Sequence, residues 1–288
     1  MRRGALLKGL AAATTTSLAG CSPPRAIGHV GQLLRGCVDT SVPPVDNVLR
    51  LVRGTFRSRH VAVPVGYAIV VPNGLPRPSP YVAYVLPGRG STAESVLAMG
   101  LPGLFAERMR ANGHAFNLAI VDAGESYFHS RTSGEDRLAM VTVDFPRVVR
   151  EVIGSEILRE ALIGQSMGGY GALLAAEREP ERYRAVAVAG PAIFPSYADE
   201  HRSVGDAFDS PDDFARHDVL AHAASLRTKP VLIVIGQRDP FLTGARMFVK
   251  ACPTAALDVQ KGCHDDGFWR TSAPELLQFV GAALTHSR

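Results

Sequence analysis

The chain has 288 residues, of which 46% are hydrophobic, 20% charged and 7% aromatic, a composition typical of globular proteins and not of disordered or fibrous ones. A chain of this length buries roughly three quarters of the surface that its unfolded form exposes, so it needs neither a metal nor a disulfide lattice to fold. The net charge is +4, and without residues 1–20, which hold three of the 31 basic residues and no acidic one, it falls to +1. No nucleic-acid partner is expected, because phosphate binding needs clustered cations.

The first twenty residues have the pattern of an export signal. A basic start at Arg2, Arg3 and Lys8 is followed by an apolar stretch and then by small residues, and the apolar stretch is too short to span a bilayer. Leu-Ala-Gly-Cys at positions 18–21 is similar to the signal box of bacterial lipoproteins, in which the cysteine is lipid-modified. We expect a lipid anchor at Cys21 and a place at the outer face of the cell membrane. Secretion with a plain signal is the alternative, and the choice between Sec and twin-arginine export stays open.

Residues 21–47 show no clear hydrophobic period and predict a tether that leads to one folded domain over 48–288. If Cys21 carries lipid, three cysteines remain, so at most one internal disulfide bond and one free thiol are expected in an oxidising compartment. The pairing of Cys37, Cys252 and Cys263 stays open, with Cys252 to Cys263 as one choice. No Cys-x-x-Cys pair is present, and we expect no metal or other cofactor.

From residue 48 onward, apolar β-rich runs alternate with segments of helical spacing. The predicted strands are 49–56 and 67–71, as an opening antiparallel pair, followed by 81–86, 118–121, 161–163, 185–189, 231–235 and 256–259. The predicted helices are 101–112, 138–153, 169–178, 243–250 and 274–284. This order predicts an α/β fold with a doubly wound, mostly parallel sheet of about eight strands, whose chemistry lies at the carboxyl ends of the strands. The polar segment 191–227 predicts a small cap and an open pocket.

A serine lies where the fifth predicted strand turns into a helix. The motif Gly-x-Ser-x-Gly at positions 164–168 follows that strand, and a helix rich in small residues follows the motif. Glycines allow the sharp turn that projects such a serine above a sheet, and the helix N-terminus beneath it favours developing negative charge. The motif therefore predicts Ser166 as a nucleophile, with a structural serine as the alternative.

A serine nucleophile needs a base and an acid, which in such folds follow it in the order serine, acid, histidine. His264 comes directly after the last predicted strand, so it is the candidate base. Asp239 follows the seventh predicted strand and is the candidate acid, although a helix N-cap is a competing role. The other histidines after Ser166 lie in polar or terminal stretches and are expected to be solvated: His201, His217, His222 and His286. The alternative acids lie away from strand ends: Asp206, Asp209, Asp212, Asp213 and Asp218.

The chemistry also needs N–H donors for an oxyanion. The N–H after the nucleophile, that of Met167, is the first by position. The loop 86–90 ends the third predicted strand and is rich in glycine, which allows close backbone approach, and we choose the N–H of Arg89 as the second donor.

Three segments carry a family resemblance: the turn at 164–169, the acid turn at 236–240, and the loop with His264 followed by Phe268 and Trp269. They resemble the esterase branch of the α/β-hydrolase superfamily, which includes S-formylglutathione hydrolases and the antigen 85 mycolyltransferases, and the likeness covers most of the chain from about residue 66.

The resemblance implies an α/β-hydrolase fold with a triad of Ser166, Asp239 and His264 and an oxyanion loop at Gly88 and Arg89. It also implies that Trp269 lies at the substrate and that residues 122–129 line the pocket, so that Tyr127 and His129 contact substrate. A packed aromatic and a solvated histidine are the alternatives for those two residues.

The expected function is that of an exported serine carboxylesterase that acts on a small-molecule acyl ester through an acyl-enzyme, without a cofactor. Two alternatives stay open: an acyltransferase of antigen 85 type that acts on a sugar or lipid hydroxyl, and a catalytically inactive binding protein with this fold. The export signal argues against a cytosolic glutathione thioester as substrate. The aspartate at 239 differs from the glutamate of antigen 85 enzymes.

Overall fold

The computed structural model describes residues 37, 40–44 and 47–286. The predicted signal peptide, the lipidation site Cys21 and most of the predicted tether lie outside the described residues. Within the described ranges, no helix is both long and apolar enough to cross a membrane.

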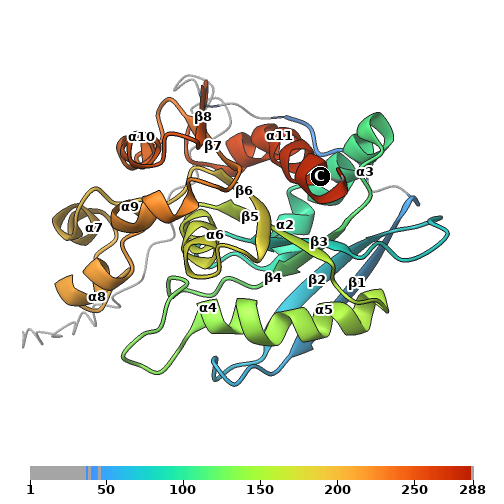
Figure 1. The fold of residues 1–288 in the computed structure, drawn as a ribbon, viewed down its shortest axis with the longest axis horizontal. Helices are drawn as coiled ribbons and strands as arrows, with labels where there is room; N and C mark the ends of the chain where they lie inside the picture. The colour runs from blue at the N-terminus through green and yellow to red at the C-terminus, as the bar shows by residue number, and fades with distance from the viewer. Residues whose placement is uncertain (1–36, 38–39, 45–46, 287–288) are drawn as a thin grey trace, which may run out of the picture.

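One eight-stranded sheet forms the centre of the molecule (Figure 1). Its strands are β1 (Leu49–Phe56), β2 (Val65–Pro72), β3 (Tyr81–Leu86), β4 (Asn117–Val121), β5 (Arg159–Gln165), β6 (Tyr183–Ala189), β7 (Val231–Gly236) and β8 (Ala256–Gln260), in the spatial order β1-β2-β4-β3-β5-β6-β7-β8. β2 is antiparallel to β1 and to β4, whereas all other neighbours are parallel. The prediction of a mostly parallel sheet with an antiparallel opening pair is confirmed.

Helices cover both faces of the sheet, as a sheet with apolar residues on both sides requires. One face packs against α2 (Ala93–Ala98), α3 (Leu101–Asn112) and α11 (Asp266–Thr285). The other face packs against α5 (Phe145–Ile153), α6 (Met167–Arg178) and α10 (Leu242–Ala251). α4 (Arg137–Ala139) continues through the π-helical turn Met140–Asp144 into α5, so the helix predicted at 138–153 is present.

The last helix starts earlier than the prediction of 274–284. α11 begins at Asp266, and Pro274 lies inside it. The side chain of Asp265 accepts a hydrogen bond from the N–H of Phe268 at 2.9 Å and caps the helix. Phe268 and Trp269 are buried against the sheet. The cap and this burial favour the earlier start and offset the hydrogen bond that a proline cannot donate.

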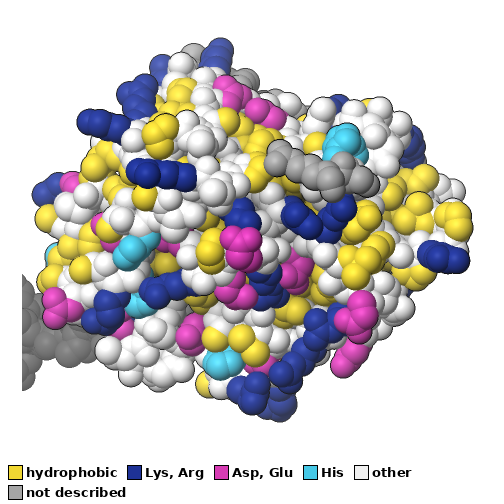
Figure 2. Space-filling model, in the orientation of Figure 1, with side chains coloured by type: hydrophobic (Ala, Val, Ile, Leu, Met, Phe, Trp, Pro, Cys, Tyr) yellow, Lys and Arg dark blue, Asp and Glu magenta, His cyan; other side chains and the backbone are white. Residues whose placement is uncertain are grey.

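The predicted cap is present as a set of short helices between β6 and β7. It consists of α7 (Tyr197–Ser203), α8 (Pro211–Arg216), α9 (Val219–His222) and the 3-10 helix Ala223–Leu226. These helices lie at the left of Figure 1, where α9 contacts α6 and α10. On the face drawn in Figure 2, basic and acidic side chains are interspersed over most of the surface, and one run of basic side chains crosses its lower part.

The cysteines pair differently from the choice of Cys252 with Cys263. A disulfide joins Cys37 to Cys263, and Cys252 is a free, buried thiol. Cys252 is fully buried at the end of α10, whereas the Cα atoms of Cys37 and Cys263 lie 5.1 Å apart.

Candidate active site

Ser166 occupies a sharp turn between β5 and α6. Its φ is 52° and its ψ is −118°, and among the described residues it is the only non-glycine residue with a positive φ. Such a conformation persists only where the surrounding structure enforces it. A Cβ added to Gly164 would lie 2.3 Å from the carbonyl oxygen of Gly168, and one added to Gly168 would lie 1.9 Å from that of Leu86. The motif glycines are therefore required by the close backbone approach around Ser166.

Asp239, His264 and Ser166 form a chain of hydrogen bonds. Nε2 of His264 lies 2.9 Å from Oγ of Ser166, and its Nδ1 lies 2.7 Å from Oδ2 of Asp239. The other oxygen of Asp239 accepts the N–H of Phe241 at 2.8 Å, and the Asp239 side chain is fully buried. Because the carboxylate can only accept at Nδ1, the neutral imidazole carries its proton there and leaves Nε2 free to accept the serine proton.

Two aromatic rings pack against the imidazole of His264 in a T-shaped arrangement. The ring centroid of Phe241 lies 5.2 Å away and that of Trp269 lies 5.4 Å away. Sequence reasoning missed Phe241, although its place two residues after Asp239 on the same turn was a usable signal. The indole of Trp269 also reaches the loop predicted to supply an oxyanion donor, since a Cβ added to Gly88 would lie 3.1 Å from the indole.

The two predicted N–H donors lie on the backbone next to Ser166. Met167 is the first residue of α6, and a Cβ added to Gly88 would lie 3.6 Å from Cβ of Ser166, which brings the Gly88–Arg89 loop beside the serine. In the part of the chain that the structure describes, neither the N–H of Met167 nor that of Arg89 donates to a protein acceptor. An N-terminal helix N–H without a partner is a ready donor to negative charge.

The Arg89 side chain joins this loop to the cap, a contact that the sequence reasoning did not anticipate. Its two terminal nitrogens each lie 2.7 Å from an oxygen of Asp206, and its Nε lies 3.2 Å from Glu125. The hydrogen bond from Arg89 lowers the pKa of Asp206. Asp206, an alternative triad acid, thus pairs with an arginine in place of a histidine.

Tyr127 and His129, the two residues predicted to contact substrate, are buried. Tyr127 is 3% exposed and packs against Tyr170, Phe194 and Phe208. His129 is 1% exposed, so the alternative of a solvated histidine is wrong. Neither side chain has the exposed surface that a direct substrate contact needs in this conformation. The reason is that the cap covers both of them with aromatic rings.

His129 belongs to a polar cluster that ties the loop after β4 to α8. Its Nε2 lies 3.2 Å from Oδ2 of Asp213, and Nδ1 of His217 lies 3.1 Å from Oδ1 of the same carboxylate. Tyr170 donates to the carbonyl of His217 at 3.1 Å and lies 3.3 Å from Nδ1 of His129. Burial lowers the pKa of His129 to about 4 and also lowers the pKa of His217. His217 is 8% exposed, contrary to the expectation of a solvated position, and Asp213 contacts two buried histidines in place of His264.

His129, Asp213 and His217 also form a group whose possible metal-ligand atoms lie within 4.8 Å of one another. Hydrogen bonds within the protein already use most of these atoms. Nδ1 of His217 bonds the carbonyl of Asp213 at 2.9 Å, and Oδ2 of Asp213 accepts the N–H of Asp209 at 3.0 Å. Four of the other alternative acids and bases serve local structure: Asp209 pairs with Arg131 and Asp218 caps α9, while His222 and His286 bond carbonyls four residues earlier.

A separate cleft of about 670 Å³ lies at the opposite edge of the sheet, near the amino ends of β5, β6 and β7. Arg159, Arg184 and Lys229 are among its lining residues. Because Ser166, Asp239 and His264 all follow the carboxyl ends of strands, this cleft is not part of the candidate active site.

Comparisons with known proteins agree with this architecture. Residues 138–269 match a family model described as "Putative esterase". The chain is 28% identical over 127 residues to the S-formylglutathione hydrolase of Mus musculus, a match that covers 41% of this chain and 45% of the mouse protein. The chain thus spans less than half the length of the curated relatives it matches.

Solved structures share the fold over most of the chain. A ferulic acid esterase superposes with a TM-score of 0.71 at 18% identity, covering 82% of this chain and 98% of its own. An S-formylglutathione hydrolase from Agrobacterium tumefaciens superposes with a TM-score of 0.68 at 18% identity, covering 86% and 98%. At these identities the likeness shows the fold, which is that of an α/β hydrolase.

Proposed function

The family match, the relatives and the structural neighbours support the esterase branch of the α/β-hydrolase superfamily, and from this premise we propose that the protein is a serine carboxylesterase acting on small-molecule acyl esters. The observation that carries the proposal is the chain of hydrogen bonds from Asp239 to His264 at 2.7 Å and from His264 to Ser166 at 2.9 Å. It begins at a buried carboxylate and ends at a hydroxyl on a strained turn.

In the proposed reaction, Oγ of Ser166 attacks the ester carbonyl while Nε2 of His264 takes its proton. Asp239 stabilises the resulting imidazolium and keeps its ring oriented. The negative oxygen of the tetrahedral intermediate is held by the N–H groups of Met167 and Arg89, because donors fixed before the reaction need no reorganisation when charge develops. Collapse of the intermediate transfers the proton from His264 to the leaving alcohol and leaves the acyl group on Ser166.

Water completes the cycle on the acyl-enzyme. His264 takes a proton from the water as it attacks the acyl carbonyl, the same two N–H groups stabilise the second oxyanion, and the proton returns to Oγ of Ser166 as the acid leaves. The atoms balance as one ester and one water giving one acid and one alcohol.

For the substrate we propose short or soluble acyl esters. The charged side chains of Arg89, Glu125 and Asp206 meet beside the loop that flanks Ser166, and they are partly or largely exposed. A polar surface of this kind favours a hydrophilic ester over a long aliphatic chain, because apolar groups gain little from contact with solvated charges.

A fluorophosphonate probe tests the activity directly, because it labels a serine that the triad has activated. We expect labelling of the wild type, no labelling of Ser166→Ala and greatly slowed labelling of His264→Ala. A series of p-nitrophenyl esters of increasing chain length then defines the acyl group. A wild-type protein that stays unlabelled and hydrolyses none of these esters would favour the inactive binding protein, and diversion of the acyl group to an added alcohol in place of water would favour an acyltransferase.

We also propose that the protein is exported and held at the outer face of the cell membrane by lipid on Cys21. The support is the pattern of residues 1–21. Several acyl chains on one residue anchor a protein stably. The measurement is cell fractionation, in which Cys21→Ala should move the protein from the membrane to the soluble fraction; a variant that stays in the membrane fraction rules out lipidation at this residue.

A further inference from the structure

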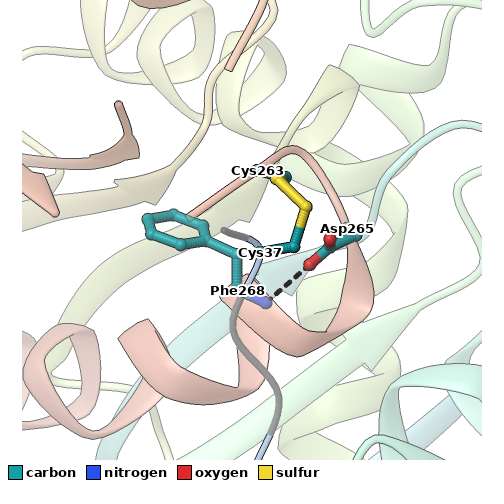
Figure 3. Close-up of a disulfide and its surroundings, with 4 residues drawn as sticks. All are labelled: Cys37, Cys263, Asp265 and Phe268. Atoms are coloured by element: carbon teal, nitrogen blue, oxygen red, sulfur yellow. Dashed lines mark hydrogen bonds between the residues drawn. A yellow bond between two sulfur atoms is a disulfide. The ribbon is translucent and has the colours of Figure 1, made fainter. Parts of the chain in front are cut away.

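The residue immediately before the proposed base forms a disulfide bond with a distant part of the chain. Cys263 precedes His264 and is joined to Cys37, which lies 226 residues earlier in the chain, with the two Cα atoms 5.1 Å apart. Figure 3 shows the bond beside the start of α11, with Asp265 and Phe268 next to it. The triad itself requires neither cysteine, so the placement of the bond calls for an explanation.

The loop that carries His264 is irregular and only partly buried. Residues 261–265 form neither helix nor strand, and residues 263–265 are half-buried. On one side of His264, the carbonyl of Gly262 accepts the N–H of Arg238 at 3.1 Å. On the other side, Asp265 accepts the N–H of Phe268 at 2.9 Å. Irregular, partly exposed loops of this kind are among the segments that open most easily.

The other end of the disulfide is fixed to the body of the protein. Arg270 in α11 donates to the carbonyl of Thr40 at 2.9 Å. A Cβ added to Gly103 in α3 would lie 2.6 Å from the carbonyl oxygen of Pro43 and 2.8 Å from that of Pro44, so residues 43–44 pack closely on that helix. Cys37 itself is 8% exposed. The bond therefore ties the His264 loop to a segment held between α3 and α11.

The disulfide bond matters most for the position of the His264 imidazole. The proton relay needs Nε2 of His264 within hydrogen-bond reach of Ser166, and a misplacement of about 1 Å can cost about 10²-fold in rate. Catalytic groups therefore need support from neighbouring bonds.

We propose that the Cys37–Cys263 disulfide is a positioning element for His264, so that full hydrolytic activity requires the oxidised cysteine pair. The inference rests on the proposed function. It adds that the protein becomes fully active only in an oxidising compartment, where such bonds form and persist. Breaking the bond takes two electrons and two protons and yields two thiols. Dithiothreitol supplies them and becomes a cyclic disulfide, and oxidised glutathione reverses the reaction while being reduced.

Serine substitutions separate the bond from the residues that make it. Cys37→Ser is the main variant, because it breaks the bond without changing a residue beside His264; Cys263→Ser and the double variant complete the set. We expect all three to lose kcat by the same factor, about 10- to 100-fold, with KM changed little, because each removes the same single bond. Cys252→Ala removes the free buried thiol and is the matched control, with kcat close to wild type at a temperature well below its unfolding midpoint.

Reduction gives an independent readout on the unmodified protein. Dithiothreitol should lower the kcat of the wild type by the factor seen in Cys37→Ser, oxidised glutathione should restore it, and Cys37→Ser should respond to neither reagent.

A variant without the base distinguishes positioning from general stability. In the His264→Ala background, adding Cys37→Ser should leave the slow residual labelling by the fluorophosphonate unchanged, because there is no imidazole left to position. A further loss in that background, or a Cys37→Ser enzyme with a kcat within about twofold of wild type, would overturn the inference. Failure of the wild type to label or hydrolyse esters would instead overturn the proposed function.

Discussion

Replacing Asp239 by asparagine exchanges one oxygen of the proposed triad carboxylate for an NH₂ group and tests how that carboxylate acts on His264. The orientation of the new side chain follows from its partners. Oδ1 of Asp239 accepts the N–H of Phe241 at 2.8 Å, so the asparagine oxygen takes that place and its NH₂ group faces Nδ1 of His264, 2.7 Å from Oδ2 in the wild type. The amide then donates to Nδ1, which forces the imidazole proton onto Nε2.

The magnitude follows from this change of tautomer. With its proton on Nε2, His264 can no longer accept from Oγ of Ser166, 2.9 Å away, and the carboxylate no longer stabilises the imidazolium. A wrong tautomer in a Ser-His-Asp triad lowers kcat by about 10⁴-fold, which corresponds to about 5.5 kcal/mol of transition-state stabilisation. The size of the side chain is unchanged, so we expect the fold to be retained.

Steady-state hydrolysis of p-nitrophenyl acetate measures kcat, and the rate of fluorophosphonate labelling reports the reactivity of Ser166 alone. Asp265→Asn is the matched control, because Asp265 caps α11 one residue after the base and asparagine is an equally good cap, so kcat should stay within about threefold of wild type. A folded Asp239→Asn enzyme with kcat within about tenfold of wild type would refute the role given to Asp239.

Three further predictions concern pH and packing. Burial raises the pKa of Glu177 to about 9 from 4.5, so the protein loses stability as the pH rises from 4.5 to 9 and this buried carboxyl group ionises. In denaturant titrations, Glu177→Gln should therefore raise the free energy of unfolding at pH 7 by about 3 kcal/mol and should not change it at pH 4. Burial lowers the pKa of His129 to about 4, so the unfolded chain binds the proton first and the stability of the protein should fall as the pH drops from 6.5 to 4. The unfolding temperature of His129→Gln should fall less steeply over this pH range than that of the wild type. An equal fall in both proteins would contradict the burial assigned to His129. A Cβ added to Gly190, whose φ is 50°, would lie 2.6 Å from Oδ2 of Asp239 and 3.1 Å from Nδ1 of His264. Gly190→Ala should therefore lower kcat sharply and lower the free energy of unfolding by about 1–3 kcal/mol. Gly113 is the control, because it has a similar φ of 67° and open space around it, so Gly113→Ala should leave kcat unchanged.

The strands and the serine turn could be predicted because their signals are local. Runs such as Val231–Gly236 are continuously apolar, as strands covered on both faces must be. The glycines around Ser166 stand within two residues of it. The start of α11 could not be predicted so well, because Pro274 resembles a first helical residue and the competing cap at Asp265 gains its advantage from the burial of Phe268 and Trp269.

The candidate site was only partly predictable for a related reason. The order serine, acid, histidine along the chain selected Ser166, Asp239 and His264, and the structure brings those three side chains into contact. The packing around them depends on the cap. No sequence pattern showed that Arg89 would pair with Asp206, 117 positions away, or that His129 would lie inside the protein against Asp213.

The sequence by itself determined the alternation of strands and helices and the tight turn at Ser166, because periodicity and glycine spacing act over a few residues. Only the tertiary structure decided that Cys263 bonds Cys37 and not Cys252, and that Asp206 and Asp213 serve the cap while Asp239 faces His264. These choices depend on distances between segments that lie far apart in the chain, and packing of the whole sheet sets those distances.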